Sequence, residues 1–299
     1  MTKQSVGIVG VGLMGHGIAL NVARKGWPLG YLDHPGNQPT DDLDALGATR
    51  HADRASLARA SEVVILCVTG TPQVEDVLLG EGGLLSALKP GTVVIDCSTA
   101  VPASTARVAA AVREAGGRFL DAPMTRTPKE AAEGRLNLLV GAEPDLFEAM
   151  KPLLSAFAEN IFHAGHEAGA GHTLKLLHNY VSLGTVTLIA EAAASAGRAG
   201  IAPEVLVDVL RKGGGHGAAL DRLSPYLLEG DSSPMRFSIA NARKDLSYYV
   251  AMAETLGAAH AVADGVLADL DGLVEAGHGN DHLPLVVKHL AAKYLAAKN

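Results

Sequence analysis

Three polar residues in the middle of the chain have types and a spacing that could do chemistry. Lys175, Asn179 and Ser182 stand at positions i, i+4 and i+7, so on a helix their side chains line one face. A lysine beside an apolar helix face is either a surface residue whose stem covers that face or a catalytic acid and base. Because lysine is rarely buried, this pattern alone favours the surface interpretation. Segments nearer the amino terminus favour catalysis.

A glycine-rich segment near the amino terminus predicts a site for a dinucleotide. A short apolar strand is predicted at residues 5–10, a G-x-G-x-x-G spacing follows, and a helical pattern covers residues 18–24. In such a turn the first glycine permits the tight bend, the second lets the backbone approach a pyrophosphate, and the third lets the helix pack on the strand. The helix N-terminus attracts the phosphate charge. The residues predicted to contact the cofactor here are Gly10, Gly12, Leu13, Met14 and Gly15.

The residue that ends the second predicted strand bears on the choice of cofactor. The strand at residues 29–32 runs into Asp33, about 20 positions after the glycines. A carboxylate there can accept from both hydroxyls of an adenosine ribose, and it would repel a 2′-phosphate. Arg24 and Lys25 are not placed to offset that repulsion. NAD is therefore predicted, with NADP as the alternative.

Alternating strand and helix patterns continue to about residue 155 and predict the sheet that positions these residues. Apolar runs at 63–68 and 93–97 are typical of parallel strands buried on both faces. Ligands of such sheets lie at the carboxyl ends of the strands, which places Val68, Thr69 and Thr99 near the cofactor. Thr99 could instead cap the helix that follows it. The remaining predicted elements are strands at 119–121 and 136–140 and helices at 72–79, 103–115 and 143–157.

After residue 168 the pattern changes to helices alone. Glycines at 165, 169 and 171 predict a flexible hinge before this block. The predicted helices are 172–197, 203–211, 216–228, 240–256, 259–276 and 283–297. Strands followed by a block of helices indicate two domains of an α/β protein. We expect a Rossmann-type, mostly parallel sheet domain over residues 1–168 and an all-α domain for substrate binding and oligomerisation over 169–299, joined by the long helix.

Composition excludes several classes of function. A chain of 299 residues with 48% hydrophobic and 19% charged residues is typical of a globular protein with a large core. The net charge of -7 argues against binding of nucleic acid or an anionic membrane. Cys67 and Cys97 lie in apolar runs and are expected to be buried, reduced thiols; with no signal peptide or membrane span visible, a cytoplasmic location is predicted. The four histidines between residues 163 and 178 match no compact zinc pattern, so no metal is predicted.

Four segments together resemble the β-hydroxyacid dehydrogenase family, which includes 3-hydroxyisobutyrate dehydrogenase and tartronate semialdehyde reductase. They are residues 7–15, 121–124, 169–179 and 244–246, and they follow the family's order across the whole chain. The resemblance implies that Lys175 is the catalytic acid and base, that Asn179 orients the substrate, and that Lys244 reaches the nicotinamide end of the cofactor. The other positions that it implies for the cofactor site are Val68, Thr69, Gln73 and Thr99.

Two departures from the family pattern stand out. Thr125-Arg126-Thr127 replaces the usual Ser-Gly-Gly, and His178 stands where the family tends to have asparagine. The first departure resembles the sulfolactaldehyde reductase branch, whose substrate ends in a sulfonate. A forked guanidinium suits a sulfonate, carboxylate or phosphonate. The residues predicted to bind substrate are Thr125, Arg126, Thr127, Asn179, Tyr180 and Ser182, whereas for His178 packing of the helix is favoured.

These residues predict an NAD-dependent oxidoreductase that interconverts a small 3-hydroxy acid, or a hydroxy sulfonate, and its semialdehyde. A free lysine is too basic to accept a proton at neutral pH, so partial burial and the positive charge of Lys244 are expected to lower the pKa of Lys175. Sulfolactaldehyde reductase is the specific prediction. The alternatives are 3-hydroxyisobutyrate, tartronate semialdehyde and 4-hydroxybutyrate enzymes, and the weaker ones are an imine reductase and a non-catalytic nucleotide-binding protein. The predicted partners are the small anionic substrate and further copies of the chain, in a homodimer or homotetramer.

Overall fold

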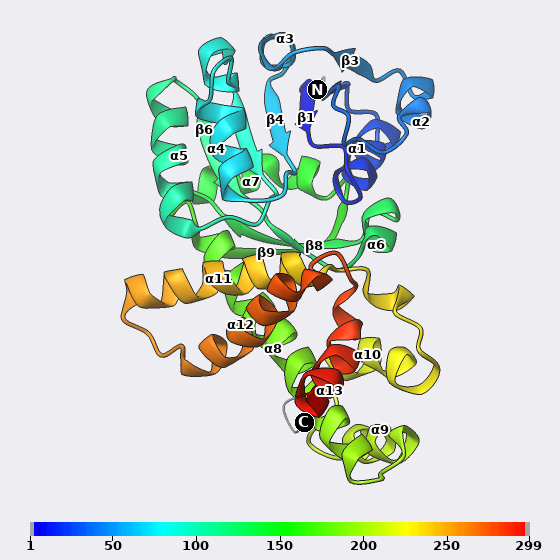
Figure 1. Cartoon of the computed structure of the whole chain (residues 1–299). Coiled ribbons are helices and arrows are strands. Elements are labelled where there is room, and N and C mark those ends of the chain that lie inside the picture. The colour runs from blue at the N-terminus through cyan, green and yellow to red at the C-terminus, as the bar shows by residue number, and fades with distance from the viewer. Residues whose placement is uncertain (1–2, 297–299) are drawn as a thin grey trace. The chain divides into compact units, whose positions relative to one another are not determined.

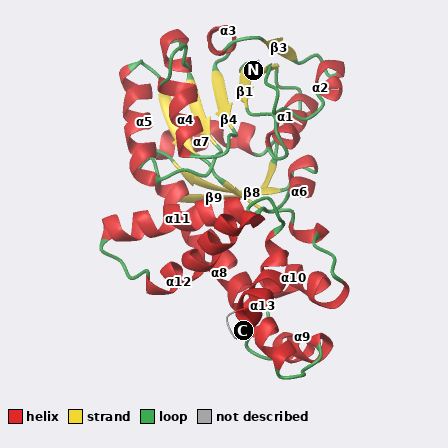
Figure 2. Ribbon diagram, viewed as in Figure 1, coloured by secondary structure: helices red, strands yellow, loops and turns green. Residues whose placement is uncertain are grey.

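The computed structural model describes the backbone of residues 3–296 and the side chains as far as residue 292. The chain divides into two compact units, Met1–Lys175 and Leu176–Asn299. Figure 1 follows the chain through both units, and Figure 2 shows that the strands of the described residues belong to the first unit. The predicted fold class, a mostly parallel sheet domain followed by a helical one, is confirmed.

One sheet organises the first unit. The strands are β1 (Val6–Val9), β2 (Leu29–Leu32), β3 (Thr49–His51), β4 (Val63–Leu66), β5 (Val93–Asp96), β6 (Arg118–Asp121), β7 (Met124–Thr125), β8 (Leu136–Gly141) and β9 (Ala158–Gly165). Their order is β3-β2-β1-β4-β5-β6-β8-β7, with β9 paired to β8. The first six of these are parallel, in the order of a Rossmann fold. β8 is antiparallel to β6 and β7 and parallel to β9.

Helices cover both faces of this sheet because alternate strand residues point to opposite sides. Val63 and Ile65 of β4 join a core with α1 and α7, whereas Val64 and Leu66 join a core with α3, α4 and α5. The helical segments of this unit are α1 (Gly15–Arg24), α2 (Asp41–Ala45), α3 (Arg54–Ala60), α4 (Thr71–Leu79), η1 (Leu84–Ala87), α5 (Pro102–Glu114), α6 (Pro128–Ala132) and α7 (Pro144–Leu154).

In the described residues of the second unit, the regular secondary structure is helical. α8 (Ala170–Arg198) starts in the first unit and runs on into the second, where Leu176, Leu183 and Val186 enter a core with α11 and α12. The remaining elements are α9 (Pro203–Lys212), α10 (Ala218–Glu229), η2 (Ser233–Met235), α11 (Ile239–Leu256), α12 (Ala261–Leu273), η3 (Val274–His278), η4 (Leu283–Leu285) and α13 (Val286–Ala296). Among the described residues, no helix has both the length and the apolar run that a bilayer crossing requires.

The differences from the predicted elements have local causes. β9 was not predicted because most of its side chains are at least partly exposed, so it lacks the apolar run of a buried strand. β3 and β7 are three and two residues long, too short for a periodic signal. The helix predicted at 259–276 ends at Leu273 and is followed directly by the π-helical turn η3, inside which Gly277 has a φ of +90°. The end of the helix predicted at 283–297 lies outside the described residues.

Candidate functional site

The ends of four parallel strands are aligned in one row. Val9, Leu66, Asp96 and Asp121 are the last residues of β1, β4, β5 and β6, and each is in register with the next. The loops that follow these strands therefore leave the sheet at a common edge, here called the carboxyl edge. The predicted cofactor residues other than Asp33 and Lys244 follow three of these strands, β1, β4 and β5, so the structure brings their segments to one edge.

The glycine turn after β1 has the geometry of a phosphate cradle. Gly10 has φ +95°, and a Cβ there would lie 2.2 Å from the carbonyl oxygen of Cys67. A Cβ on Gly15 would lie 1.9 Å from the carbonyl oxygen of Gly10, whereas a Cβ on Gly12 would meet no atom within 4 Å. The first and third glycines thus permit close packing, and the second leaves the backbone open. α1 begins without a side-chain cap from Met14, which suits its N–H groups to a phosphate.

A carboxylate and a guanidinium lie together at the end of β2. Asp33 is exposed, and its Oδ2 is 4.0 Å from Nη1 of Arg50 on the neighbouring strand β3. Arg50 is further held by the hydroxyl of Tyr31, 3.0 Å from its Nε, and by Asp44, 3.3 Å from its Nη2. A donor that could pair with a 2′-phosphate and an acceptor for a ribose hydroxyl are therefore both present at the end of β2.

The loops after β4 and β5 are joined by hydrogen bonds. Ser98 accepts from the backbone N–H of Val68 at 3.1 Å, and its own N–H donates to Asp96 at 2.9 Å. Val68 and Thr99 are half-buried, while Thr69 and Gln73 are exposed. The alternative that Thr99 caps the next helix is wrong, because α5 begins at Pro102 and its N-cap is Val101.

Asp121 ties the first turn of α8 to the carboxyl edge. Its fully buried carboxylate accepts from the backbone N–H groups of Gly169 and His172, both at 2.7 Å. A Cβ on Gly171 would lie 2.2 Å from the carbonyl oxygen of Leu139 on β8, so only glycine lets the helix approach this strand. The glycines that predicted a flexible hinge include one required for close packing. Two of the family segments, 121–124 and 169–179, thus meet at one contact.

His172 completes this anchor from the first turn of α8. Its imidazole is fully buried, with Nδ1 at 2.8 Å from the Thr105 hydroxyl and Nε2 at 3.1 Å from the Ser98 carbonyl oxygen. Carboxyl oxygens of Asp121 and Asp96 lie 3.6 and 3.9 Å from the ring nitrogens. Burial raises the pKa of the Asp121 carboxyl, and the nearby imidazole acts in the opposite direction. Lys175, which is half-buried, follows three positions later on the same helix. The anchor therefore fixes the position of the helix turn from which the Lys175 side chain extends.

Two predicted site residues of the second unit, Asn179 and Lys244, are linked through Asp245. Asn179 donates from Nδ2 to Asp245 at 2.7 Å, and the other oxygen of Asp245 is 3.1 Å from the Lys244 amine. Asp245 is buried, so its carboxylate holds the amide and the amine in fixed positions. Tyr180 stacks on Tyr249 with ring centroids 4.2 Å apart. Ser182 is half-buried, and Nδ1 of the exposed His178 is 3.0 Å from Oδ1 of Asn179.

The side chains of Thr125, Arg126 and Thr127 all have partners inside the first unit. The hydroxyl of Thr125 accepts from Asn137 at 3.0 Å. Thr127 is the N-cap of α6 and forms a reciprocal capping box with Glu130. Arg126 donates from Nη1 to the Arg135 carbonyl oxygen and pairs with Glu159 of β9.

The backbone of Arg126 has a left-handed conformation. Its φ is +84°, and among the described residues it is the one non-glycine with a positive φ. Glycine adopts this conformation without steric cost, whereas arginine does not. The Ser-Gly-Gly expected for the family would fit the same backbone, so the arginine side chain is present despite a conformational cost.

Four residues at these positions were missed in the sequence. Arg50 and Glu159 lie on β3 and β9, the strands whose patterns gave no signal. Asp245 adjoins Lys244 in the sequence, and a carboxylate next to a predicted cofactor lysine could have indicated a pair. For His172, the position beside Gly171 at the start of an apolar helix is the sequence signal for a structural role.

Comparisons with known proteins cover both units. Residues 5–165 match a family model described as the NAD binding domain of 6-phosphogluconate dehydrogenase. Residues 169–289 match one described as NAD-binding of NADP-dependent 3-hydroxyisobutyrate dehydrogenase.

Individual relatives are similar over most of their length. The chain is 33% identical to the 2-hydroxy-3-oxopropionate reductase of Escherichia coli over 253 residues, 85% of either chain. It is 33% identical to the NAD-dependent L-serine dehydrogenase of Pseudomonas aeruginosa over 223 residues, 75% of this chain and 74% of the relative. The crystal structure of 3-hydroxyisobutyrate dehydrogenase from Salmonella typhimurium superposes with a TM-score of 0.84 at 29% identity, covering 95% of this chain and 99% of that one.

Proposed function

Because the chain belongs to the β-hydroxyacid dehydrogenase family, we propose that it interconverts a small 3-hydroxy acid or hydroxy sulfonate and its semialdehyde, with Lys175 as acid and base. The chain is an NAD(P)-dependent oxidoreductase that acts on hydroxyl groups. The observation that carries the proposal for Lys175 is the buried Asp121–His172 anchor, which fixes the helix turn that precedes it. An amine on a helix fixed in this way can be held at one place beside a substrate.

The residues of the first unit divide the work of holding the cofactor. When bound, NAD(P) supplies or takes up the hydride. The N–H groups around Gly12 and Met14 would hold the pyrophosphate, and Asp33 would accept from the ribose hydroxyls. Val68, Thr69, Gln73 and Thr99 would line the remainder of the cofactor site. For Lys244 of the second unit we propose the role that the family resemblance implies, contact with the nicotinamide end of the cofactor.

Lys175 moves the proton. In the reductive direction its ammonium donates to the carbonyl oxygen of the substrate, and in the oxidative direction its neutral amine accepts the hydroxyl proton. Asn179 orients the substrate, and its amide is supported in this role by the hydrogen bond to Asp245. Tyr180 and Ser182 complete the substrate site on this helix.

We infer that Arg126, together with Thr125 and Thr127, meets the acidic end of the substrate. The support is the left-handed backbone at this position. Glycine would adopt it at a lower conformational cost, so the presence of arginine indicates that its side chain has a role. Glu159 already pairs with this guanidinium, but both contacts use Nη1 of a group with five N–H donors. A substrate acid therefore shares the guanidinium with Glu159 or displaces it. A sulfonate remains fully ionised at any working pH, so it can always pair with the guanidinium. We therefore favour sulfolactaldehyde as the substrate.

Arg126→Gly is expected to raise KM for acidic substrates about tenfold or more and to leave KM for a neutral alcohol of the same length unchanged. Glycine keeps the left-handed backbone, so only the guanidinium is lost. Glu159→Gln is the matched variant: it removes the competing carboxylate and should lower KM for acids. Steady-state kinetics with acidic substrates and neutral alcohols measure these changes in KM. Equal changes in KM for both substrate types would refute the role of Arg126 in binding the substrate acid.

Asp33→Ser is expected to raise the ratio of kcat/KM for NADP to that for NAD about tenfold or more, because a like charge no longer faces the 2′-phosphate and Arg50 remains to pair with it. The control is Asp44→Asn, since Asp44 also contacts Arg50 but does not follow β2. We propose NAD as the preferred cofactor of the unaltered chain. An unchanged ratio in the Asp33 variant would show that this carboxylate does not select the cofactor.

The substrate is tested directly with a panel. Dihydroxypropanesulfonate, 3-hydroxyisobutyrate, glycerate, 4-hydroxybutyrate, threonate and L-serine are assayed with NAD and NADP by absorbance of the reduced cofactor. The proposal expects at least one acid to be oxidised with a higher kcat/KM than its neutral alcohol. Cofactor binding without turnover of any acid would refute it.

We also infer that the helical part from residue 169 serves substrate binding and self-association in a homodimer or homotetramer. Apolar side chains on α8 and α9 support this: Val181, Leu188, Val205 and Val209 are each more than half exposed. Sedimentation velocity of the purified chain tests the inference, and a monomer at micromolar concentration would contradict it.

A further inference from the structure

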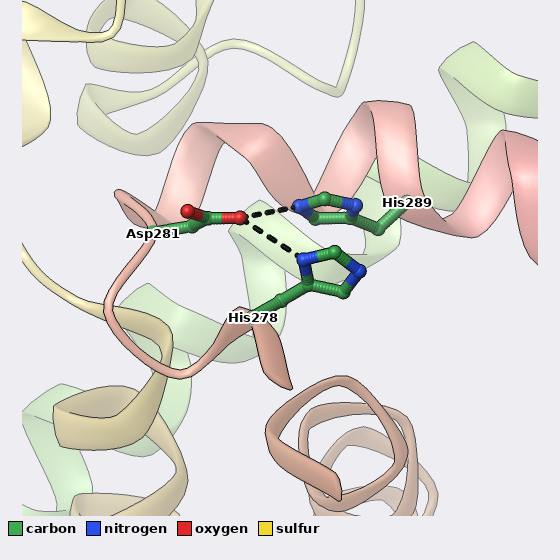
Figure 3. Close-up of side chains that lie close together, drawn as sticks. All are labelled: His278, Asp281 and His289. Atoms are coloured by element: carbon green, nitrogen blue, oxygen red, sulfur yellow. Dashed lines mark hydrogen bonds and ion pairs between the residues drawn. The ribbon is translucent and has the colours of Figure 1, made fainter. Parts of the chain in front are cut away.

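In the second unit, one nitrogen from each of two imidazoles faces the same carboxylate oxygen. Figure 3 shows His278 at the end of η3, Asp281 in the next loop and His289 on α13. Oδ2 of Asp281 lies 3.2 Å from Nδ1 of His278 and 2.9 Å from Nε2 of His289. The three donor atoms all lie within 4.8 Å of one another.

The backbone around this cluster is fixed before any ligand binds. The N–H of Asp281 donates to the His278 carbonyl oxygen at 3.1 Å, and the Asp281 carbonyl oxygen accepts from Ile239 at 3.0 Å. Gly279 is tied in the same way to Ala240, so the loop is fastened to α11 at two places. The rings of His278 and His289 stack with centroids 3.7 Å apart. Little ordering remains to be done when a ligand enters.

The two imidazoles converge on one carboxylate oxygen. One imidazole is enough to pair with a partly exposed carboxylate, yet both imidazoles direct a nitrogen at the same oxygen of Asp281. A single cation between the three atoms would use all of them. Two imidazole nitrogens and one carboxylate oxygen form a donor set found for zinc and neighbouring transition metals.

We propose that His278, Asp281 and His289 bind one divalent transition-metal ion, with Zn²⁺ as the reference case. Metal–ligand distances of about 2.0–2.1 Å in a tetrahedral site put adjacent ligand atoms roughly 3.3 Å apart. The two separations that involve Asp281, 2.9 and 3.2 Å, are close to this value, and the two imidazole nitrogens lie within 4.8 Å of each other. His278 and Asp281 are 39% and 37% exposed, which leaves solvent access for a fourth ligand.

The sequence did not indicate this site. Its spacing is H-x-x-D followed by a histidine eight positions on, and His278 lies in a glycine-rich loop that resembles a solvated turn. The site is independent of the proposed dehydrogenase reaction, because none of its three residues is assigned to cofactor or substrate.

The test is calorimetric titration of the tag-free, chelator-treated full chain with Zn²⁺, followed by the absorption spectrum with Co²⁺. One tight equivalent per chain is expected, and the Co²⁺ complex should show visible bands of a four- or five-coordinate ion. His278→Gln, Asp281→Asn and His289→Gln should each weaken this equivalent about tenfold or more.

His282→Gln is the matched control. This histidine adjoins Asp281 in the sequence but faces Ser232, 3.0 Å from its Nδ1, so its loss should leave the tight equivalent intact. Circular dichroism without metal confirms that each variant is folded. Absence of a tight equivalent in the unaltered chain, or equal affinity in all four variants, would overturn the proposal.

Discussion

Lys175→Ala is expected to lower kcat about a hundredfold or more, while the Kd for NAD(P) stays within about twofold of the unaltered chain. The amine is assigned only to proton transfer, and the residues assigned to hold the pyrophosphate and ribose lie in the loops after β1 and β2. Single-turnover kinetics measure the chemical step, and fluorescence titration of the reduced cofactor measures binding.

Two further variants sharpen this test. Lys175→Arg keeps a positive charge but cannot release a proton near neutral pH, so it should be as inactive as the alanine variant. Lys212→Ala removes an exposed lysine that pairs with Asp208 on α9 and should leave kcat unchanged. An alanine variant within tenfold of the unaltered kcat would remove Lys175 from the mechanism.

Gly171→Ala is expected to destabilise the chain by about 2 kcal/mol or more and to lower kcat as well. The added Cβ would lie 2.2 Å from the Leu139 carbonyl oxygen and 2.8 Å from a carboxyl oxygen of Asp121. Both atoms belong to the sheet, so the first turn of α8 has to move and carries Lys175 with it. Urea unfolding and steady-state kinetics measure the two effects.

Gly197→Ala is the matched control on the same helix. A Cβ there meets no atom within 4 Å, so the substitution should be neutral or stabilise the chain by about 0.5–1 kcal/mol. If Gly197→Ala loses as much stability as Gly171→Ala, the loss cannot be assigned to the contact with β8.

The parts of the fold that could be predicted are those with local signals. Apolar runs such as residues 63–68 predicted the central strands, and the glycine turn with Asp33 predicted the order of strand, helix and strand around the cofactor. β3 and β9 could not be predicted, because their positions depend on pairing with strands distant in the sequence and their side chains are largely exposed.

The residues of the candidate site also fall into those that a local sequence pattern predicts and those that it does not. The face that carries Lys175 and Asn179 follows from helical spacing, so it could be read along the chain. The residues that contact the predicted site residues could not be predicted from the sequence. Glu159 reaches Arg126 from β9, and Asp245 reaches Asn179 from α11, in each case through tertiary packing that no local pattern encodes.

The left-handed backbone at Arg126 also restricts how this position can change during evolution. Most replacements would retain the torsional penalty and forfeit the contact with Glu159, so they would lose on both counts. Glycine escapes the penalty, and a long basic side chain offsets it. Related sequences should therefore have either glycine or a basic residue paired with an acid at position 126, and other residue types there should be rare.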